Sequence, residues 1–230
     1  MDELVATTAD ADRLRDELAA IEEEQATLEA ELAAFNADYL REVVTVLAEL
    51  HEIEARIAAA VAKRSGTAED KAAASSARAR ARETTAAVEA IPPAPEPLPT
   101  GDLKKLFREA AKRMHPDLAP DDETRQHAEA FMKRLNQAFS ARDEEAIVNL
   151  VRQWEAARPV ADDDPRRVSA LVTAVDRARA RLEEVRGSEL AAMMERAMAA
   201  AASGTDLLAK WRASAEVALA AARVKLAALQ

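Results

Sequence analysis

The chain has 230 residues, of which 49% are hydrophobic but only 3% aromatic, and its formal net charge is −10. Glycine occurs 4 times and cysteine is absent, which excludes disulfides and thiolate metal sites. Much of the apolar content is alanine, a composition typical of long helices packed through small side chains. We therefore expect an all-α fold and no sheet.

The negative net charge of the chain also indicates which partners and which cellular compartment to expect. Nucleic acid and anionic membrane surfaces repel such a chain on average, so neither is an expected partner. Charged residues break every alanine-rich stretch well before membrane-spanning length. The start, Met1-Asp2-Glu3, has no apolar signal core. The sequence thus favours a cytoplasmic protein.

The first sixty or so residues carry a heptad pattern. Mostly apolar residues alternate at spacings of four and three, and the phase slips by four residues between Tyr39 and Val43. The run before the slip is Leu14, Leu18, Ile21, Gln25, Leu28, Leu32, Phe35 and Tyr39, and the run after it is Val43, Val46, Leu50, Ile53 and Ile57. The pattern predicts one helix over about residues 3–63, with a stutter that locally relaxes a left-handed supercoil.

Ser65-Gly66-Thr67 then offers a C-terminal glycine followed by a capping threonine. Residues 68–90 are alanine-rich and helix-prone, so we expect residues 1–90 to form an antiparallel, coiled-coil helical hairpin. The arginines of this segment, Arg78, Arg80 and Arg82, lie two positions apart and do not share a helix face. They favour a solvated basic stretch over a nucleic-acid contact.

Residues 91–101 hold five prolines and predict an extended, semi-stiff linker, after which Thr100 or Asp102 can cap the next helix. A second boundary is marked by Arg158-Pro159 and by residues 162–165. These signals divide the remaining chain into a central region, 102–157, and a C-terminal helical hairpin or coiled coil, 158–230.

In the C-terminal segment, heptad spacing recurs at Leu171, Val175, Ala178, Leu182 and Val185. This helix is expected to end at Arg186-Gly187, with Ser188 capping its continuation. Two arms with heptads fit a homodimer, and they equally fit one chain that folds its own arms antiparallel. The pattern does not choose between them.

The central region contains the most informative segment, residues 103–117. One helix face is apolar, and it holds Leu103, Phe107, Ala110, Ala111 and Met114. The rest of this helix carries five positive charges, from Lys104, Lys105, Arg108, Lys112 and Arg113. The helix must end near His115, because Pro116 disfavours helical geometry in the residue before it. We expect His115 and Asp117 to project from a tight, exposed turn.

A second amphipathic helix follows the loop 118–122, with Ala128, Met132, Leu135 and Phe139 on its apolar face. This pair of helices, joined by His115-Pro116-Asp117, resembles helices two and three of the J-domain family over about residues 100–150. The family's first helix has no match in the proline linker, and residues 141–145 replace the signature of its fourth helix. The flanking coiled coils are the natural cover for the apolar face left open. The layout looks like that of bacterial J-domain proteins with long coiled-coil arms.

The resemblance implies a co-chaperone that recruits a DnaK-type chaperone and stimulates its ATP hydrolysis, with arms that dock an unknown client or partner protein. In that role Asp117 would make the charged contact with an arginine of the chaperone, His115 would support the turn and hydrogen-bond the partner, and Pro116 would fix the geometry. The residues that would steer the encounter with an acidic chaperone surface are Lys104, Lys105, Arg108, Lys112 and Arg113. The alternative is a structural or adaptor coiled-coil protein whose degenerate J-domain is only a packing module.

Other chemistry has little support in the sequence. The three histidines, His51, His115 and His127, are too dispersed for metal-ligand spacing. No nucleophile–base pairing and no glycine-rich phosphate loop is present. We therefore expect no cofactor, no metal and no enzymatic activity.

Overall fold

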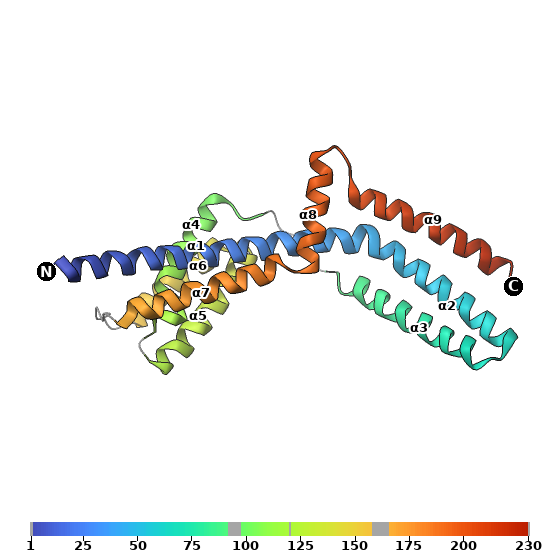
Figure 1. Cartoon of the computed structure of the whole chain (residues 1–230), viewed down its shortest axis with the longest axis horizontal. Helices are drawn as coiled ribbons and strands as arrows, with labels where there is room; N and C mark the ends of the chain where they lie inside the picture. Colours follow the sequence, from blue (N-terminus) through green and yellow to red (C-terminus); the bar gives the residue numbers. More distant parts are fainter. Residues whose placement is uncertain (1, 92–97, 120, 158–165, 230) are drawn as a thin grey trace. The chain divides into compact units, whose positions relative to one another are not determined.

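The computed structural model describes residues 2–91, 98–119, 121–157 and 166–229 (Figure 1). All regular structure in these residues is helical, as the composition predicts. Among them, no helix combines the length and the apolar character needed to cross a membrane. The centre of the proline-rich linker, residues 92–97, and the boundary sequence 158–165 lie outside the described residues.

The long N-terminal helix forms as predicted, with one irregular turn. Helix α1 spans Asp2–Tyr39, a π-helical turn η1 spans Leu40–Val44, and α2 spans Thr45–Ser65. The π turn lies where the heptad pattern slips. A π turn holds more residues than an α turn, so it changes the phase of the apolar face without ending the helix.

The predicted helical hairpin is formed by α2 and α3, which spans Ala68–Glu89. Gly66 ends α2 in the left-handed conformation, at φ 71°, where a glycine has no steric penalty. Thr67 caps α3, because its hydroxyl accepts the Asp70 N–H at 3.1 Å. Nδ1 of His51 and Oγ1 of Thr84 lie 2.8 Å apart across the hairpin.

The helices pack as two compact units, divided at Leu32 and Ala191. The first unit contains α1 up to Leu32 together with α4 to α7, and the second contains the remainder of α1, η1, α2, α3 and α9. Each unit therefore joins an N-terminal helix to a C-terminal one. This grouping cuts across the four consecutive segments expected from the sequence.

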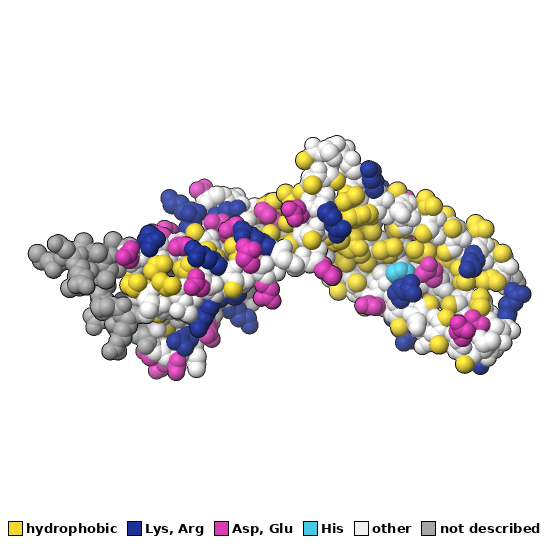
Figure 2. Space-filling view, viewed as in Figure 1, with side chains coloured by type: hydrophobic (Ala, Val, Ile, Leu, Met, Phe, Trp, Pro, Cys, Tyr) yellow, Lys and Arg dark blue, Asp and Glu magenta, His cyan; other side chains and the backbone are white. Residues whose placement is uncertain are grey.

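In the second unit, α9 (Leu207–Ala227) runs parallel to the N-terminal helix, which it contacts at η1 and α2. The rings of Tyr39 and Trp211 meet edge to face with centroids 6.0 Å apart, and further along Arg223 lies 2.8 Å from Glu49. Helix α8 (Glu189–Ala202) precedes α9, and Ser188 caps it as predicted, accepting the Ala191 N–H at 3.2 Å. Apolar side chains gather over α2 and beside α9 (Figure 2).

In the first unit, α7 (Arg166–Arg186) also runs parallel to its N-terminal partner, α1. Arg179 pairs with Glu17, and Arg186 lies 2.5 Å from Glu24; both pairs are 162 residues apart in sequence. The apolar seam between the two helices consists of Ala11, Leu14, Leu18, Leu171, Ala174, Val175 and Ala178. Several of these are the predicted heptad residues, but their partner is a parallel helix of the same chain.

The central region supplies α4 (Gly101–Met114), a 3-10 turn η2 (Pro116–Leu118), α5 (Asp122–Ser140) and α6 (Glu144–Ala157). Thr100 caps α4, accepting the Leu103 N–H at 3.1 Å. The Phe107 and Phe139 rings, both fully buried, lie 4.7 Å apart at the centre of the core. Ala19 and Ala26 of α1 belong to the same buried cluster. The N-terminal arm thus helps to cover the apolar face of the helix pair, as expected from the sequence.

Candidate partner-binding site

The turn at His115-Pro116-Asp117 has a fixed local geometry. His115 ends α4 with an extended backbone, at φ −67° and ψ 130°, as the following proline requires. Pro116 then starts the 3-10 turn, and Nδ1 of His115 accepts the Asp117 N–H at 3.2 Å. Because a backbone N–H can only donate, Nδ1 carries no proton, so Nε2 must carry one and act as a donor.

The predicted exposure of this turn is wrong for His115, which is only 5% exposed. Its Nε2 lies 3.3 Å from Oε1 of Glu22 on α1, and Arg181 on α7 lies 2.5 Å from the same oxygen. Asp117 is half-buried, 3.9 Å from Arg177 of α7. The arms that complete the core of the helix pair therefore also cover its turn.

Glu22 is the buried acid at the centre of this arrangement. Burial alone would raise the pKa of its carboxyl group, because desolvation penalises the charged form. The hydrogen bond with His115 and the charge of Arg181 outweigh that effect, and the pKa of Glu22 lies below its ordinary value. Glu22 is therefore an ionised carboxylate at neutral pH.

The basic face of α4 is directed at the same arm. Lys104, Arg108 and Lys112 follow one another at intervals of four and so lie on one side of the helix. Glu23 of α1 lies 4.0 Å from Lys104 and 3.4 Å from Arg108. Lys112 pairs with Asp16 of α1, and this hydrogen bond raises the pKa of the Lys112 ammonium group.

The two other cations of α4 point elsewhere. Arg113 pairs with Glu155 of α6. Lys105 is exposed, with no carboxylate within 4.0 Å of it in the part of the chain that the structure describes. The structure thus brings Lys104, Arg108, Lys112 and His115 together against α1, and leaves Lys105 open to solvent.

No protein-family model, curated protein or solved structure matches the chain. The site offers a hydrogen-bonded turn, a row of cations and a half-buried carboxylate, which are groups that bind a charged protein surface. Within the described residues there is no cluster of histidine and acidic side chains that could hold a metal ion.

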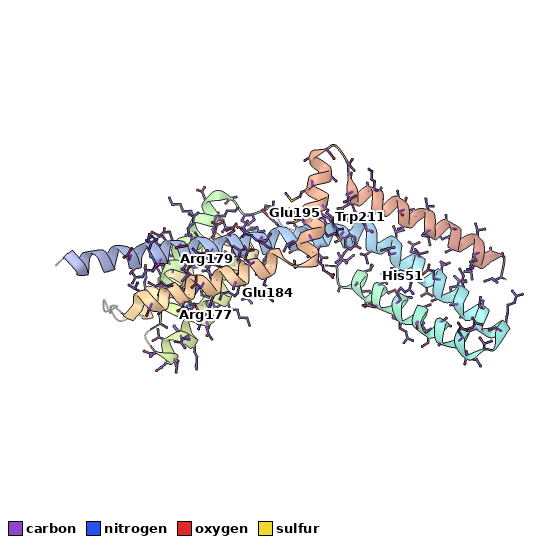
Figure 3. All side chains as sticks on the ribbon, in the orientation of Figure 1. His51, Arg177, Arg179, Glu184, Glu195 and Trp211 are labelled. Carbon is purple, nitrogen blue, oxygen red and sulfur yellow. The ribbon has the colours of Figure 1, made fainter. Side chains whose placement is uncertain are left out.

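Sequence reasoning missed the residues that occupy this site. No sequence motif singles out Asp16, Glu22 and Glu23 of α1 or Arg177 and Arg181 of α7. Figure 3 shows Arg177 and Arg179 on α7, among the arginines that this helix contributes. One signal was available: the first helix is acidic and residues 104–113 are basic, so the two segments are complementary in charge.

Neither of the two remaining histidines belongs to the turn. The exposed ring of His127 stacks on Trp154, with centroids 5.8 Å apart and planes inclined by 19°. His51 belongs to the α2–α3 hairpin, where it is half-buried. Their positions agree with the surface or core-edge placement expected from the sequence.

Proposed function

We propose that this protein is a J-domain-like co-chaperone that recruits a DnaK-type chaperone and stimulates its ATP hydrolysis. The proposal is supported above all by the His115-Pro116-Asp117 turn, which directly follows a basic amphipathic helix and precedes a second helix packed against it. Because the bond between Asp117 N–H and His115 Nδ1 fixes the turn, the Asp117 carboxylate has a defined position. The protein itself makes and breaks no covalent bond in this role.

The docking surface would be the basic residues of α4 together with the turn. Lys105 and Arg113 are exposed, and complementary charge across an interface speeds the encounter and fixes its register. Asp117 would then pair with a cation of the chaperone. The helical arms would dock a client or partner protein, whose identity their sequence does not specify.

The test is single-turnover ATP hydrolysis by a DnaK-type chaperone, measured with and without the full-length protein. We expect the protein to raise the rate, and His115→Gln and Asp117→Asn to remove the effect. Lys105→Ala should weaken stimulation without affecting folding, because Lys105 is exposed. Lys133→Ala, which removes an exposed lysine of α5, is the matched control and should behave as wild type. If Asp117→Asn gives the same rate as its parent, both in the wild-type chain and in variants that free the basic face of α4, this function is wrong.

A second candidate function is a structural or adaptor protein in which the J-domain-like region is a packing module. It is favoured by one observation, the burial of His115 against Glu22 of the same chain. This function predicts that the purified protein, including variants that free the basic face of α4, neither binds the chaperone nor changes its hydrolysis rate.

A further inference from the structure

The acidic face of α1 occupies the surface that the proposed function assigns to the chaperone. We infer that α1 is an intramolecular competitor, so that a DnaK-type chaperone gains access to His115 and to the α1-facing cations of α4 only when α1 is displaced. This inference rests on the proposed function and concerns the regulation of the same site. It is carried by the charge pattern and by the burial of His115.

The charge pattern of α1 matches that of α4. Lys104, Arg108 and Lys112 face Glu23 and Asp16, which lie seven residues apart on α1. Residues seven apart lie on nearly the same side of a helix, so the two acids form one face. An acidic partner surface would meet the same three cations. The two surfaces therefore exclude each other.

At the turn, the burial of His115 also prevents a partner protein from binding this side chain while α1 is in place. A partner that hydrogen-bonds His115 needs Nε2, because Nδ1 is already used by the Asp117 N–H. Nε2 faces Glu22, and the His115 side chain is 4% exposed. No second protein can reach this atom while Glu22 stays in place.

Part of the site remains accessible while α1 is in place. Lys105 is exposed, and the Asp117 side chain is 23% exposed with Arg177 near the 4 Å limit of an ion pair. An encounter can therefore begin at these groups before α1 is displaced. The apparent affinity of the partner equals its intrinsic affinity multiplied by the fraction of open molecules.

The experiment compares two charge-matched variants of the full chain. The uncovering variant carries Asp16→Asn, Glu22→Gln and Glu23→Gln, which remove the three acids that face α4 and the turn. The control variant carries Asp10→Asn, Glu17→Gln and Glu24→Gln, which remove three acids of the same helix that pair with Arg13 of α1 and with Arg179 and Arg186 of α7. Binding to a DnaK-type chaperone is measured by titration, and stimulation by single-turnover ATP hydrolysis.

We expect the uncovering variant to bind at least about tenfold more tightly than wild type, the factor by which the open fraction rises, and the control to match wild type. Asp117→Asn in the uncovering background should remove both binding and stimulation. Equal activity of wild type, control and uncovering variant would overturn the competition while leaving the co-chaperone function intact. No binding by any of them would overturn both.

A single substitution tests the same competition in case the uncovering variant, with its three substitutions, does not fold. Asp16→Lys places a cation opposite Lys112, and the Asp16 side chain is 60% exposed, so the core is not disturbed. Circular dichroism should show unchanged helix content, and amide hydrogen exchange in α4 should become faster. Unchanged binding by a folded Asp16→Lys variant would count against the competition.

Discussion

Glu22 and His115, 93 residues apart in sequence, share a buried hydrogen bond of 3.3 Å that ties the N-terminal arm to the end of α4. The carboxylate of Glu22 also receives Arg181 of α7 at 2.5 Å. One acid thus joins three segments of the first unit. The ring of His115 is held from both sides, because its Nδ1 is occupied by the backbone of Asp117.

Glu22→Gln should destabilise the first unit by about 1–3 kcal/mol, since it replaces a charged acceptor of a buried hydrogen bond by a neutral one. The chain has 2 tryptophans, and Trp154 lies in the first unit whereas Trp211 lies in the second. Urea denaturation in a Trp211→Phe background therefore reports the first unit through Trp154 fluorescence.

Glu24→Gln is the matched control for this measurement. Glu24 is exposed and pairs with Arg186 at the surface, where an ion pair contributes roughly 0–1 kcal/mol. We expect its denaturation midpoint to stay close to that of wild type. Equal midpoints for Glu22→Gln and Glu24→Gln would mean that the buried bond does not stabilise the unit.

The lowered pKa of Glu22 predicts that the stability of the first unit decreases at acidic pH. The folded-state pKa of Glu22 is lower than its ordinary value of 4.5, so ionised Glu22 stabilises the folded state above that value. The contribution is lost as the pH falls from 4.5 through the lowered pKa. In the Trp211→Phe background, the stability of wild type should fall more steeply below pH 4.5 than that of Glu22→Gln. Parallel curves for the two proteins would contradict this.

Local features of the fold followed from local sequence signals. The phase slip between Tyr39 and Val43 predicted an irregularity where the π turn lies, and the caps at Gly66, Thr67 and Ser188 formed as expected. Caps and heptads are predictable because the interacting groups lie within a few residues of each other.

Long-range placement was not predictable in the same way. The heptads of α1 and α7 show that each helix has an apolar seam, but a seam does not specify which helix covers it or in which direction. The exposed position expected for His115 followed from the proline alone. Its burial depends on Glu22 and Arg181, which come from helices far away in sequence.

The second unit should respond to pH through His51. Burial of the His51 imidazole between α2 and α3 is the main cause that lowers its pKa below 6.5. The nearby charge of Glu54 raises this pKa and that of Arg80 lowers it, and the net shift is downward. Because the unfolded state then binds the proton more strongly, the stability of the folded hairpin should decrease as the pH falls below 6.5. Thermal unfolding followed by Trp211 in a Trp154→Phe background should show this between pH 7.5 and 5.5.

His51→Gln is the control for that experiment, since its amide can contact Thr84 but does not titrate. We expect its unfolding temperature to change less over this pH range than that of wild type. Comparing the two proteins removes the contribution of every other titrating group. A pH dependence as large in His51→Gln as in wild type would assign the effect to other residues.

The π turn makes a prediction about helix phase. Each residue of an α-helix turns the chain by about 100°. With i→i+5 bonding, each residue of a π turn rotates the chain by only about 80°. The five residues of η1 therefore rotate the chain by about 400°, as four α-helical residues would. Deleting Glu42, so that the turn becomes α-helical, leaves the orientation of α2 relative to Tyr39 nearly unchanged. Helix α9 packs on both sides of this point, through Trp211 against Tyr39 and through Arg223 against Glu49. It can therefore keep both contacts in the deletion variant, whereas one residue inserted after Ala48, within the α-helical part, rotates Glu49 and the rest of α2 by about 100°.

We therefore expect the Glu42 deletion to cost the second unit less than about 1 kcal/mol. An alanine inserted after Ala48 should instead destabilise this unit by at least about 2 kcal/mol, comparable to the burial of one leucine side chain. Urea denaturation monitored by Trp211 in the Trp154→Phe background measures the loss. Glu42→Ala keeps the residue count and should cost less than about 0.5 kcal/mol, as for most surface substitutions. A deletion that costs as much as the insertion would mean that the π turn does not keep α2 in phase with Tyr39.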